Sequence, residues 1–286
     1  MIGRLTLSQP SFSRISELMY ARSGVALRPQ KNAMVVSRLT PVLRELNMDS
    51  FEGYLGYLDN HWEDKDIVDR FVNAITTNRT EFFRDKNQYR ALAKELRSLR
   101  DSDHNASKLI RIWSAACSTG EEAYSIAMVG REIFSADEFG RLRILASDID
   151  TEVLTNASAG IFKSHQLNPI PRRWLKSGFG SPDPNDPLRR TIHPDLRKMI
   201  VFRRINLVTD EFRFRKPVDI VFLCNVMIYF DIKTQDLILE KIRRILRPDG
   251  LLFVGHAESS AVSRHGFLHL GNNAFRRTGD LERIEV

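Results

Sequence analysis

The chain contains 286 residues, of which 42% are hydrophobic and 28% are charged, as is ordinary for a globular protein. No apolar run reaches the ~18 residues that a membrane-spanning helix requires, and the opening residues lack an apolar signal region, so we expect a cytoplasmic protein without membrane insertion. Two cysteines, Cys117 and Cys224, are too few for a zinc cluster; we expect free thiols and no metal. The net charge of +7 admits nucleic acid, an anionic membrane or an acidic protein as partner.

The first 85 residues predict helices. Ser8 can cap a helix that Gly24 ends, and a second helix is expected over 29–46. Two shorter helices are expected over 50–59 and 64–76, where apolar residues recur at helical spacing. We therefore expect a small bundle of amphipathic helices.

Basic residues gather in this region. Five lie between residues 22 and 44, which contain no acidic residue. Lys31 and Arg38 lie two helical turns apart, on what we expect to be one exposed flank of the second helix. A solvated helix face is the simpler explanation, and steering of an acidic partner is the alternative.

The sequence pattern changes from helical to alternating strand and helix after a helix and polar linker, which we place at 87–108. Apolar runs such as 218–223 then alternate with helical patterns, which indicates a parallel sheet covered on both faces. The ending GFLHLGNNAFRR predicts a closing antiparallel hairpin. Strands are expected near 109–115, 142–147, 199–204, 218–224 and 250–255, and helices near 122–134, 151–158 and 234–246.

Residues 160–198 interrupt this alternation. They are basic and irregular, and they include the glycine- and proline-rich run GFGSPDPNDP, which predicts a surface loop. So long an interruption suggests an inserted subdomain. We therefore divide the chain into a helical domain (1–86), a helix and linker (87–108) and an α/β domain (109–286) that carries the insertion.

The most informative stretch is residues 110–123, IRIWSAACSTGEEA. An apolar strand breaks into small residues and a glycine before a helix begins, which is where α/β folds bind nucleotide-like cofactors. Glu121 and Glu122 would repel a pyrophosphate at this turn. Asp148, after the next strand, could accept both hydroxyls of a ribose. A ribose-containing cofactor without phosphate, such as S-adenosylmethionine, fits this pattern.

Six motifs occur in one order along the chain. Together they resemble the CheR family, the chemotaxis receptor methyltransferases, and the resemblance covers nearly the whole sequence. It implies an α/β fold with a Rossmann-like class I methyltransferase sheet, an N-terminal all-helical domain and a small β-subdomain inserted at about 160–198. The motifs are NRTEFFR (78–84), WSAACSTGEEAYSIA (113–127), ASDIDTEVL (146–154), INL (205–207), NVMIYF (225–230) and LRPDG (246–250).

The resemblance implies roles for the first motif. In this family the helical domain closes over S-adenosylmethionine, and Asn78, Thr80 and Arg84 match its cofactor-contacting residues. Arg84 is also placed near the transferred methyl group, where a guanidinium could bind a carboxylate substrate in two-point fashion.

The resemblance assigns further cofactor contacts to the ends of the strands. Glu122 matches the acidic residue at the amino acid end of the cofactor, and Asp148 matches the ribose contact. Asn206 and Leu207 match residues that flank adenine, and Asn225 matches a contact near the methionine part. We expect Asp150 to be only the N-cap of the next helix.

Three positions complete the site. Tyr229 matches a residue on the rim of the active site, although an aromatic there is more often part of the core. Cys224 stands where many relatives have arginine, so a backbone contact to the cofactor would persist but a charged side-chain role would not. Gly120 alone represents the glycine-rich turn, which makes a generic dinucleotide site a poor match.

The resemblance therefore predicts a protein-glutamate O-methyltransferase that acts on the cytoplasmic domains of chemoreceptors. We expect it to act as a monomer and not to bind nucleic acid. Lys31 and Arg38 then become candidate receptor-binding residues, because receptor glutamate clusters are acidic. Alternatives are an RNA methyltransferase, a nicotinamide dehydrogenase and a non-catalytic receptor-binding scaffold. The proline-rich run 181–187 predicts that a C-terminal receptor peptide is not needed as a tether.

Overall fold

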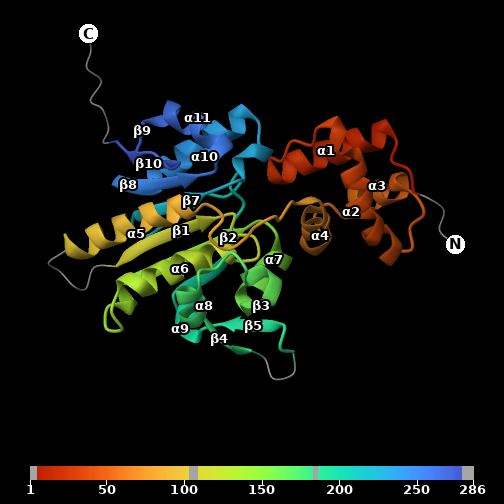
Figure 1. Ribbon diagram of the computed structural model, residues 1–286. Helices are drawn as coiled ribbons and strands as arrows, with labels where there is room; N and C mark the ends of the chain where they lie inside the picture. The colour runs from red at the N-terminus through yellow and green to blue at the C-terminus, as the bar shows by residue number, and fades with distance from the viewer. Residues whose placement is uncertain (1–4, 103–108, 183–185, 279–286) are drawn as a thin grey trace, which may run out of the picture.

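The computed structural model describes residues 5–102, 109–182 and 186–278 (Figure 1). Its N-terminal part is the predicted bundle of helices, packed around a common apolar core. Ser8 caps the first helix and Gly24, with φ of 73°, ends it, as expected. The second helix is preceded by a 3-10 turn, Pro29–Lys31. The helices are α1 (Gln9–Ser23), α2 (Asn32–Glu45), α3 (Phe51–Asn60) and α4 (Lys65–Ile75).

A 7-stranded sheet forms the centre of the second part, in the order β6-β2-β1-β7-β8-β10-β9. The strands from β6 to β8 are parallel, and β10 and β9 are the expected antiparallel hairpin. The strands are β1 (Ile110–Ala115), β2 (Leu142–Asp148), β6 (Ile200–Arg204), β7 (Val218–Leu223), β8 (Leu246–Val254), β9 (Phe267–His269) and β10 (Ala274–Arg277).

One strand differs from its prediction. β8 runs from Leu246 to Val254, whereas we expected a strand only near 250–255. Leu246 pairs with Val218, and the register shifts before Ile220 pairs with Leu251. The extra residues are accommodated as an irregularity of the ladder, with Asp249 at φ of 60°.

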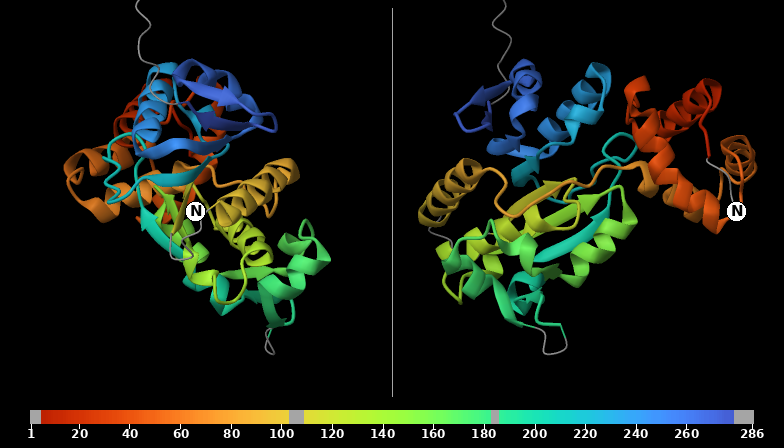
Figure 2. Two further views of the ribbon diagram at one scale, coloured as in Figure 1. Left: turned by 90° about the vertical axis from the view of Figure 1, so that its left-hand side faces the viewer. Right: turned by 45° about the vertical axis from the view of Figure 1, so that its right-hand side comes forward.

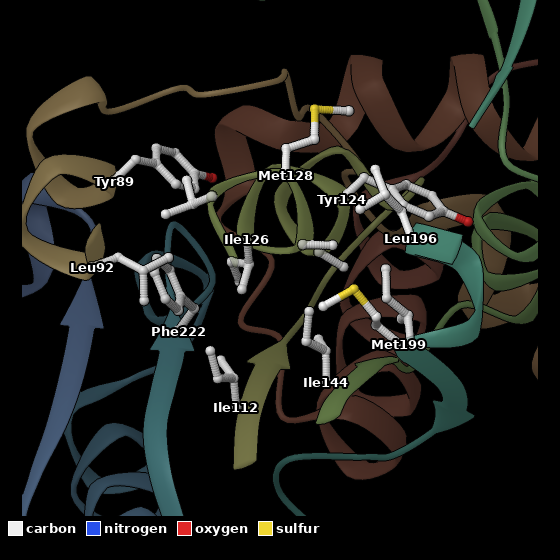
Figure 3. Close-up of a cluster of buried hydrophobic side chains, with 14 of the residues drawn as sticks. Tyr89, Leu92, Ile112, Tyr124, Ile126, Met128, Ile144, Leu196, Met199 and Phe222 are labelled. Carbon is white, nitrogen blue, oxygen red and sulfur yellow. The ribbon is translucent and has the colours of Figure 1, made fainter. Parts of the chain in front are cut away.

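Helices cover both faces of the sheet because strand residues alternate between them. Ile112 of β1 contacts the core under α5 and α6, whereas its neighbour Trp113 contacts the core under α10. Figure 3 shows the first of these cores, in which Tyr89 of α5 and Ile126 of α6 lie over Ile112 and Phe222. The covering helices are α5 (Lys86–Asp101), α6 (Glu121–Ile133) and α10 (Ile232–Ile245).

The segment 160–198 folds into a small 3-stranded antiparallel sheet in the order β3-β5-β4, at the bottom of Figure 1. It follows α7 (Thr151–Ala159) and leads into β6. Of the proline-rich run, residues 183–185 lie outside the described residues, as does 103–108 of the linker. Its elements are β3 (Ile161–Lys163), α8 (Arg172–Gly178), β4 (Phe179–Pro182), β5 (Arg189–Ile192) and α9 (Pro194–Lys198).

The helical bundle lies to one side of the sheet, beside the ends of its parallel strands (Figure 2). Arg204, at the end of β6, donates to Asp69 of α4 at 2.7 Å. Asn73 of α4 donates at 2.9 Å to the hydroxyl of Thr151, the first residue of α7. These polar contacts fix the bundle over the edge where the candidate residues of the sheet lie. The domain limits at 86 and 108 stay a prediction.

Candidate cofactor site

A cavity of about 420 Å³ opens between the helical bundle and the carboxyl edge of the sheet. This volume lies within the ~300–1,000 Å³ range of small-molecule sites. Every predicted site residue except Arg38 lines this cavity. The first and the last of these residues, Lys31 and Tyr229, are 198 positions apart in the sequence. These residues are Lys31, Asn78, Thr80, Arg84, Glu122, Asp148, Asn206, Leu207, Cys224, Asn225 and Tyr229.

The turn after β1 shapes the floor of the cavity. Ala116 and Ser118 have φ of 68° and 50°, a left-handed conformation that costs non-glycine residues about 1–3 kcal/mol each. Gly120 has φ of 97°, and a Cβ there would lie 3.0 Å from the Cβ of Ala157. This strained turn brings the first turn of α6 and the backbone of Ser118 to the end of β2.

Asp148 is the last residue of β2 and is buried. One carboxylate oxygen accepts the backbone N–H of Ser118 at 2.9 Å, and the other accepts that of Asp150 at 3.1 Å. Burial raises the pKa of the Asp148 carboxyl to about 6. A carboxylate has about four lone-pair positions, so two remain for the hydroxyls of a ribose. Asp148 therefore fits the predicted contact.

Glu122 lies in the first turn of α6, and the hydroxyl of Ser114 donates to its carboxylate at 2.6 Å. Burial raises the pKa of Glu122 to about 7, against the opposing effect of hydrogen bonds from Ser114 and Cys224. A carboxyl group that titrates near neutrality inside a cavity is a candidate binding group. An ammonium group of a ligand would stabilise its charged form.

Glu121 is the first residue of α6, and its side chain contacts residues outside the helix. It is buried, and its carboxylate accepts from the hydroxyl of Thr119 at 2.6 Å and from the amide of Gln166 at 3.3 Å. Gln166 belongs to the inserted segment. Glu121 therefore connects the cofactor-side helix to that segment.

Asn78 lines the cavity, but its side chain is engaged elsewhere. Its amide donates to the carboxylate of Asp150 at 2.6 Å, and the hydroxyl of Thr76 donates to the same oxygen at 2.8 Å. Asp150 is the N-cap of α7, as expected, and it also anchors the segment after α4. Sequence reasoning missed this second role, because the partners lie more than 70 positions apart.

Asn206 is buried and holds the loop after β6 in place. Its side-chain oxygen accepts the N–H of Val208 at 2.9 Å, and its amide donates to the carbonyl of Arg22 at 2.7 Å, at the end of α1. The ammonium of Lys241 donates to the carbonyl of Val208 at 2.6 Å. These contacts fix Leu207 in the wall of the cavity.

Glu258 holds the loop after β7, and the sequence analysis did not identify it. Its buried carboxylate accepts the backbone N–H groups of Asn225 at 2.9 Å, Met227 at 2.7 Å and Gly255 at 2.5 Å. Asn225 has φ of 59°. The sequence offered one clue to this role: Glu258 is a single glutamate shortly after the apolar run 251–254, in a segment that otherwise has the composition of the core.

Cys224 lies in the wall of the cavity, with its thiol 3.6 Å from the side-chain oxygen of Gln88. Gln88 in turn donates to the carbonyl of Val254 at 2.6 Å. Burial raises the pKa of the Cys224 thiol well above its ordinary value, so this position offers no charge to a ligand. Both Cys224 and Cys117 are free thiols.

Arg84, Thr80 and Tyr229 lie toward the open side. Arg84 is exposed, and its guanidinium donates to the carbonyl of Arg79 at 3.2 Å in the same loop. Thr80 and Tyr229 are half-buried. The carbonyl of Tyr229 accepts the N–H of Ala26 at 2.9 Å, which joins the rim to the helical bundle.

The structure corrects the expected flank of Lys31 and Arg38. Lys31 is exposed and lines the cavity, whereas Arg38 is half-buried. The guanidinium of Arg38 donates to the carbonyl of Ile75 at 2.6 Å and also to that of Thr76. It thus satisfies the carbonyl end of α4, which is a favourable place for a cation. The two side chains do not form one free stripe.

Comparison with known proteins decides the family. The all-alpha domain of CheR methyltransferases matches residues 10–76, and the S-adenosylmethionine-binding domain of CheR methyltransferases matches residues 78–274. The chain belongs to the CheR methyltransferase family. Its fold is therefore the α/β methyltransferase fold with an N-terminal helical domain that the resemblance implied.

Several CheR relatives are similar over most of their length. A chemotaxis protein methyltransferase of Escherichia coli is 37% identical over 281 residues, 98% of this chain and 95% of the relative. That of Salmonella typhimurium is 39% identical over 263 residues, 91% of this chain and 87% of the relative. That of Borreliella burgdorferi is 31% identical over 261 residues, 89% and 90% of the two chains.

Within residues 5–102, 109–182 and 186–278, no helix is both long and apolar enough to cross a membrane. In the same ranges, no group of three or more His, Cys, Asp or Glu side chains is placed to hold a metal ion. The contacts of individual residues with a cofactor stay predictions.

Proposed function

We propose that this CheR protein transfers the methyl group of S-adenosylmethionine to glutamate side chains on the cytoplasmic domains of chemoreceptors. Family membership and the names of the relatives, which are chemotaxis protein methyltransferases, support the proposal. A receptor substrate of this kind would place the enzyme in the cytoplasm. The RNA methyltransferase, dehydrogenase and non-catalytic alternatives are not favoured by these relatives.

The observation that carries the proposal is a pair of carboxyl groups in one cavity, with Asp148 buried and Glu122 half-buried. Asp148 has lone pairs free for ribose hydroxyls, and Glu122 could meet the cationic amino acid end of the cofactor. Two carboxylates suit a ligand that contains a ribose and positive charge, and they would repel the pyrophosphate of a dinucleotide. These groups therefore fit S-adenosylmethionine.

Methyl transfer to a carboxylate asks for positioning more than for acid–base chemistry. A glutamate side chain is ionised near pH 7, since its ordinary pKa is about 4.3. One of its oxygens forms a bond to the methyl carbon while the bond from that carbon to sulfur breaks, and no proton moves. Arg84 could hold the substrate carboxylate in line, and closure of the helical bundle would exclude water.

The proposal is tested by incubation with a labelled methyl donor and either a receptor cytoplasmic fragment or RNA. We expect label on the fragment and its release as methanol in mild base, because methyl esters hydrolyse there. Base-stable label, or label on RNA, would contradict a glutamyl ester.

Cofactor affinity should depend on pH through Glu122. Its carboxyl group has a pKa of about 7, and an ammonium group binds the carboxylate but not the acid. Affinity should therefore fall as the pH drops through about 7, and Glu122 alone should contribute a decline that approaches roughly tenfold per pH unit. Calorimetry between pH 5.5 and 8.5 measures it. Glu122→Gln should leave only the decline due to Asp148, whose pKa is about 6; a flat wild-type profile would exclude this role.

Lys31 and Arg38 should respond differently to charge reversal. Lys31→Glu should raise the KM for the receptor fragment several-fold and weaken its salt dependence, with a smaller effect on cofactor affinity, because an exposed charge acts by steering. Arg38→Glu should instead lower the melting temperature, because it leaves carbonyls at the end of α4 without their donor. Identical KM values for wild type and Lys31→Glu would show that Lys31 is an ordinary solvated surface residue with no role in receptor binding.

Other features of the proposed function rest on sequence reasoning. We propose that the enzyme acts as a monomer and needs no C-terminal receptor peptide as a tether. The support for the second point is the proline-rich run 181–187, of which residues 181–182 and 186–187 are described. Prolines there would remove donors that an added peptide strand needs.

A further inference from the structure

The inserted segment 160–198 packs its aromatic side chains against the loop that carries Arg84. Phe82 is fully buried between this segment and the main domain. Its ring lies 4.8 Å from that of Phe162 in β3 and 5.8 Å from that of Phe179 at the start of β4, both edge to face. The small sheet therefore forms part of the support beneath the residue pair that precedes Arg84.

Phe83 depends on this segment even more directly. It has φ of 52°, a left-handed conformation that is unfavourable for an aromatic residue and persists only where surrounding contacts impose it. Its ring is stacked on Trp174 of α8, with centroids 4.4 Å apart and planes at 16°. The ring of Tyr89 meets it edge to face at 5.0 Å, and its backbone N–H donates to Ser125 at 3.1 Å.

Trp174 is itself held from its outer side. Its indole N–H donates to the carboxylate of Glu132 in α6 at 2.5 Å. The guanidinium of Arg173 lies 4.6 Å from the centre of its ring and 3.7 Å from Glu132. Trp174 is half-buried, so it is one layer of a stack rather than a member of the deep core.

Arg84 has no comparable anchor of its own among the contacts described. It is exposed, and its guanidinium donates to the carbonyl of Arg79, within the same loop. The direction of its side chain therefore depends on the backbone at Phe83, which the stack with Trp174 holds in place. A shift of about 1 Å in a positioning group can cost a hundredfold in rate.

We propose that Trp174 is a positioning residue for Arg84, so that the inserted segment acts on the methyl-transfer step as well as forming a surface of its own. The proposal rests on the proposed function, in which Arg84 orients the substrate carboxylate. In this proposal, the stacked rings of Trp174 and Phe83 couple the inserted segment 160–198 to the active site.

The test compares Trp174→Ala with Trp174→Phe. Trp174→Ala removes the stack, and turnover of the receptor fragment should fall about 10- to 100-fold while KM and cofactor affinity change less than about threefold. Trp174→Phe loses the bond to Glu132 but keeps a ring over Phe83, so it should retain most of the turnover. Phe139→Ala is the control, because Phe139 is a partly buried aromatic at the edge of the same core and lies beside Arg131, near the C-terminal end of α6, whereas Phe83 bonds to Ser125 in its N-terminal half.

A second readout needs no receptor. Hydrogen exchange of the Phe83 amide, which donates to Ser125, should become faster in Trp174→Ala and not in Phe139→Ala. Failure of the wild-type enzyme to methylate receptors would reject the proposed function and leave this readout intact. Unchanged exchange at Phe83, wild-type turnover of Trp174→Ala, or an equal loss in Phe139→Ala would overturn the positioning role.

Discussion

Replacement of Asp148 by alanine should weaken S-adenosylmethionine binding by roughly 1.5–3 kcal/mol, or about 10- to 150-fold. The reason is the loss of hydrogen bonds from ribose hydroxyls to a charged acceptor. Backbone donors from Ser118 and Asp150 now point at this carboxylate, so its removal also leaves them without a protein partner. Isothermal calorimetry with the cofactor and its demethylated product measures the effect.

Asp150→Ala is the matched control. Asp150 lies two residues away and caps α7, so its loss should cost stability, about 0.5–2 kcal/mol, more than cofactor affinity. If Asp148→Ala binds as tightly as the wild type, or if Asp150→Ala is the variant that loses affinity, the ribose contact is not at Asp148.

The second large effect is expected at Arg84. Arg84→Lys retains the positive charge but loses the planar pair of donors that matches a carboxylate, so turnover should fall by about 10- to 100-fold. Cofactor affinity should fall much less, because the interaction concerns the substrate in the transition state. Steady-state kinetics with the receptor fragment, together with cofactor calorimetry, separate the two quantities.

Arg79→Lys provides the comparison for this variant. Arg79 lies in the same loop and also lines the cavity, and its carbonyl, which accepts from Arg84, is unchanged by the substitution. It should keep turnover within a few-fold of the wild type. Full turnover by Arg84→Lys would contradict two-point binding of the carboxylate and would leave Arg84 only a general electrostatic role.

Most of the architecture could be predicted because its signals are local. Ser8 and Gly24 mark both ends of α1, and the apolar run 218–223 marks a strand buried on both faces. The start of β8 could not be predicted from its own residues. Leu246 joins the sheet only because Val218 offers a partner across an irregular register, a condition set by tertiary contacts.

The site shows the same division between local and distant signals. Asp148 ends a recognisable strand, Glu122 lies in the first turn of the helix that follows another, and family resemblance supplied most of the other predicted lining residues. The hydrogen-bond partners were not predictable, since Asn78 meets Asp150 and Asn225 meets Glu258 only after the chain has folded. Arg38 has the sequence pattern of a surface residue, but it satisfies carbonyls of another helix. Such pairings depend on the tertiary arrangement and leave no local pattern.

The central claim is that the transferred methyl group ends on glutamate oxygens of a receptor. The most direct measurement is peptide mapping by mass spectrometry of a receptor cytoplasmic fragment after incubation with the enzyme and S-adenosylmethionine. The account predicts one added methyl group on individual glutamate side chains, removed by mild base and absent when Arg84→Ala replaces the wild-type enzyme. Methyl groups on lysine, arginine or the chain terminus, or an unmodified fragment, would contradict it.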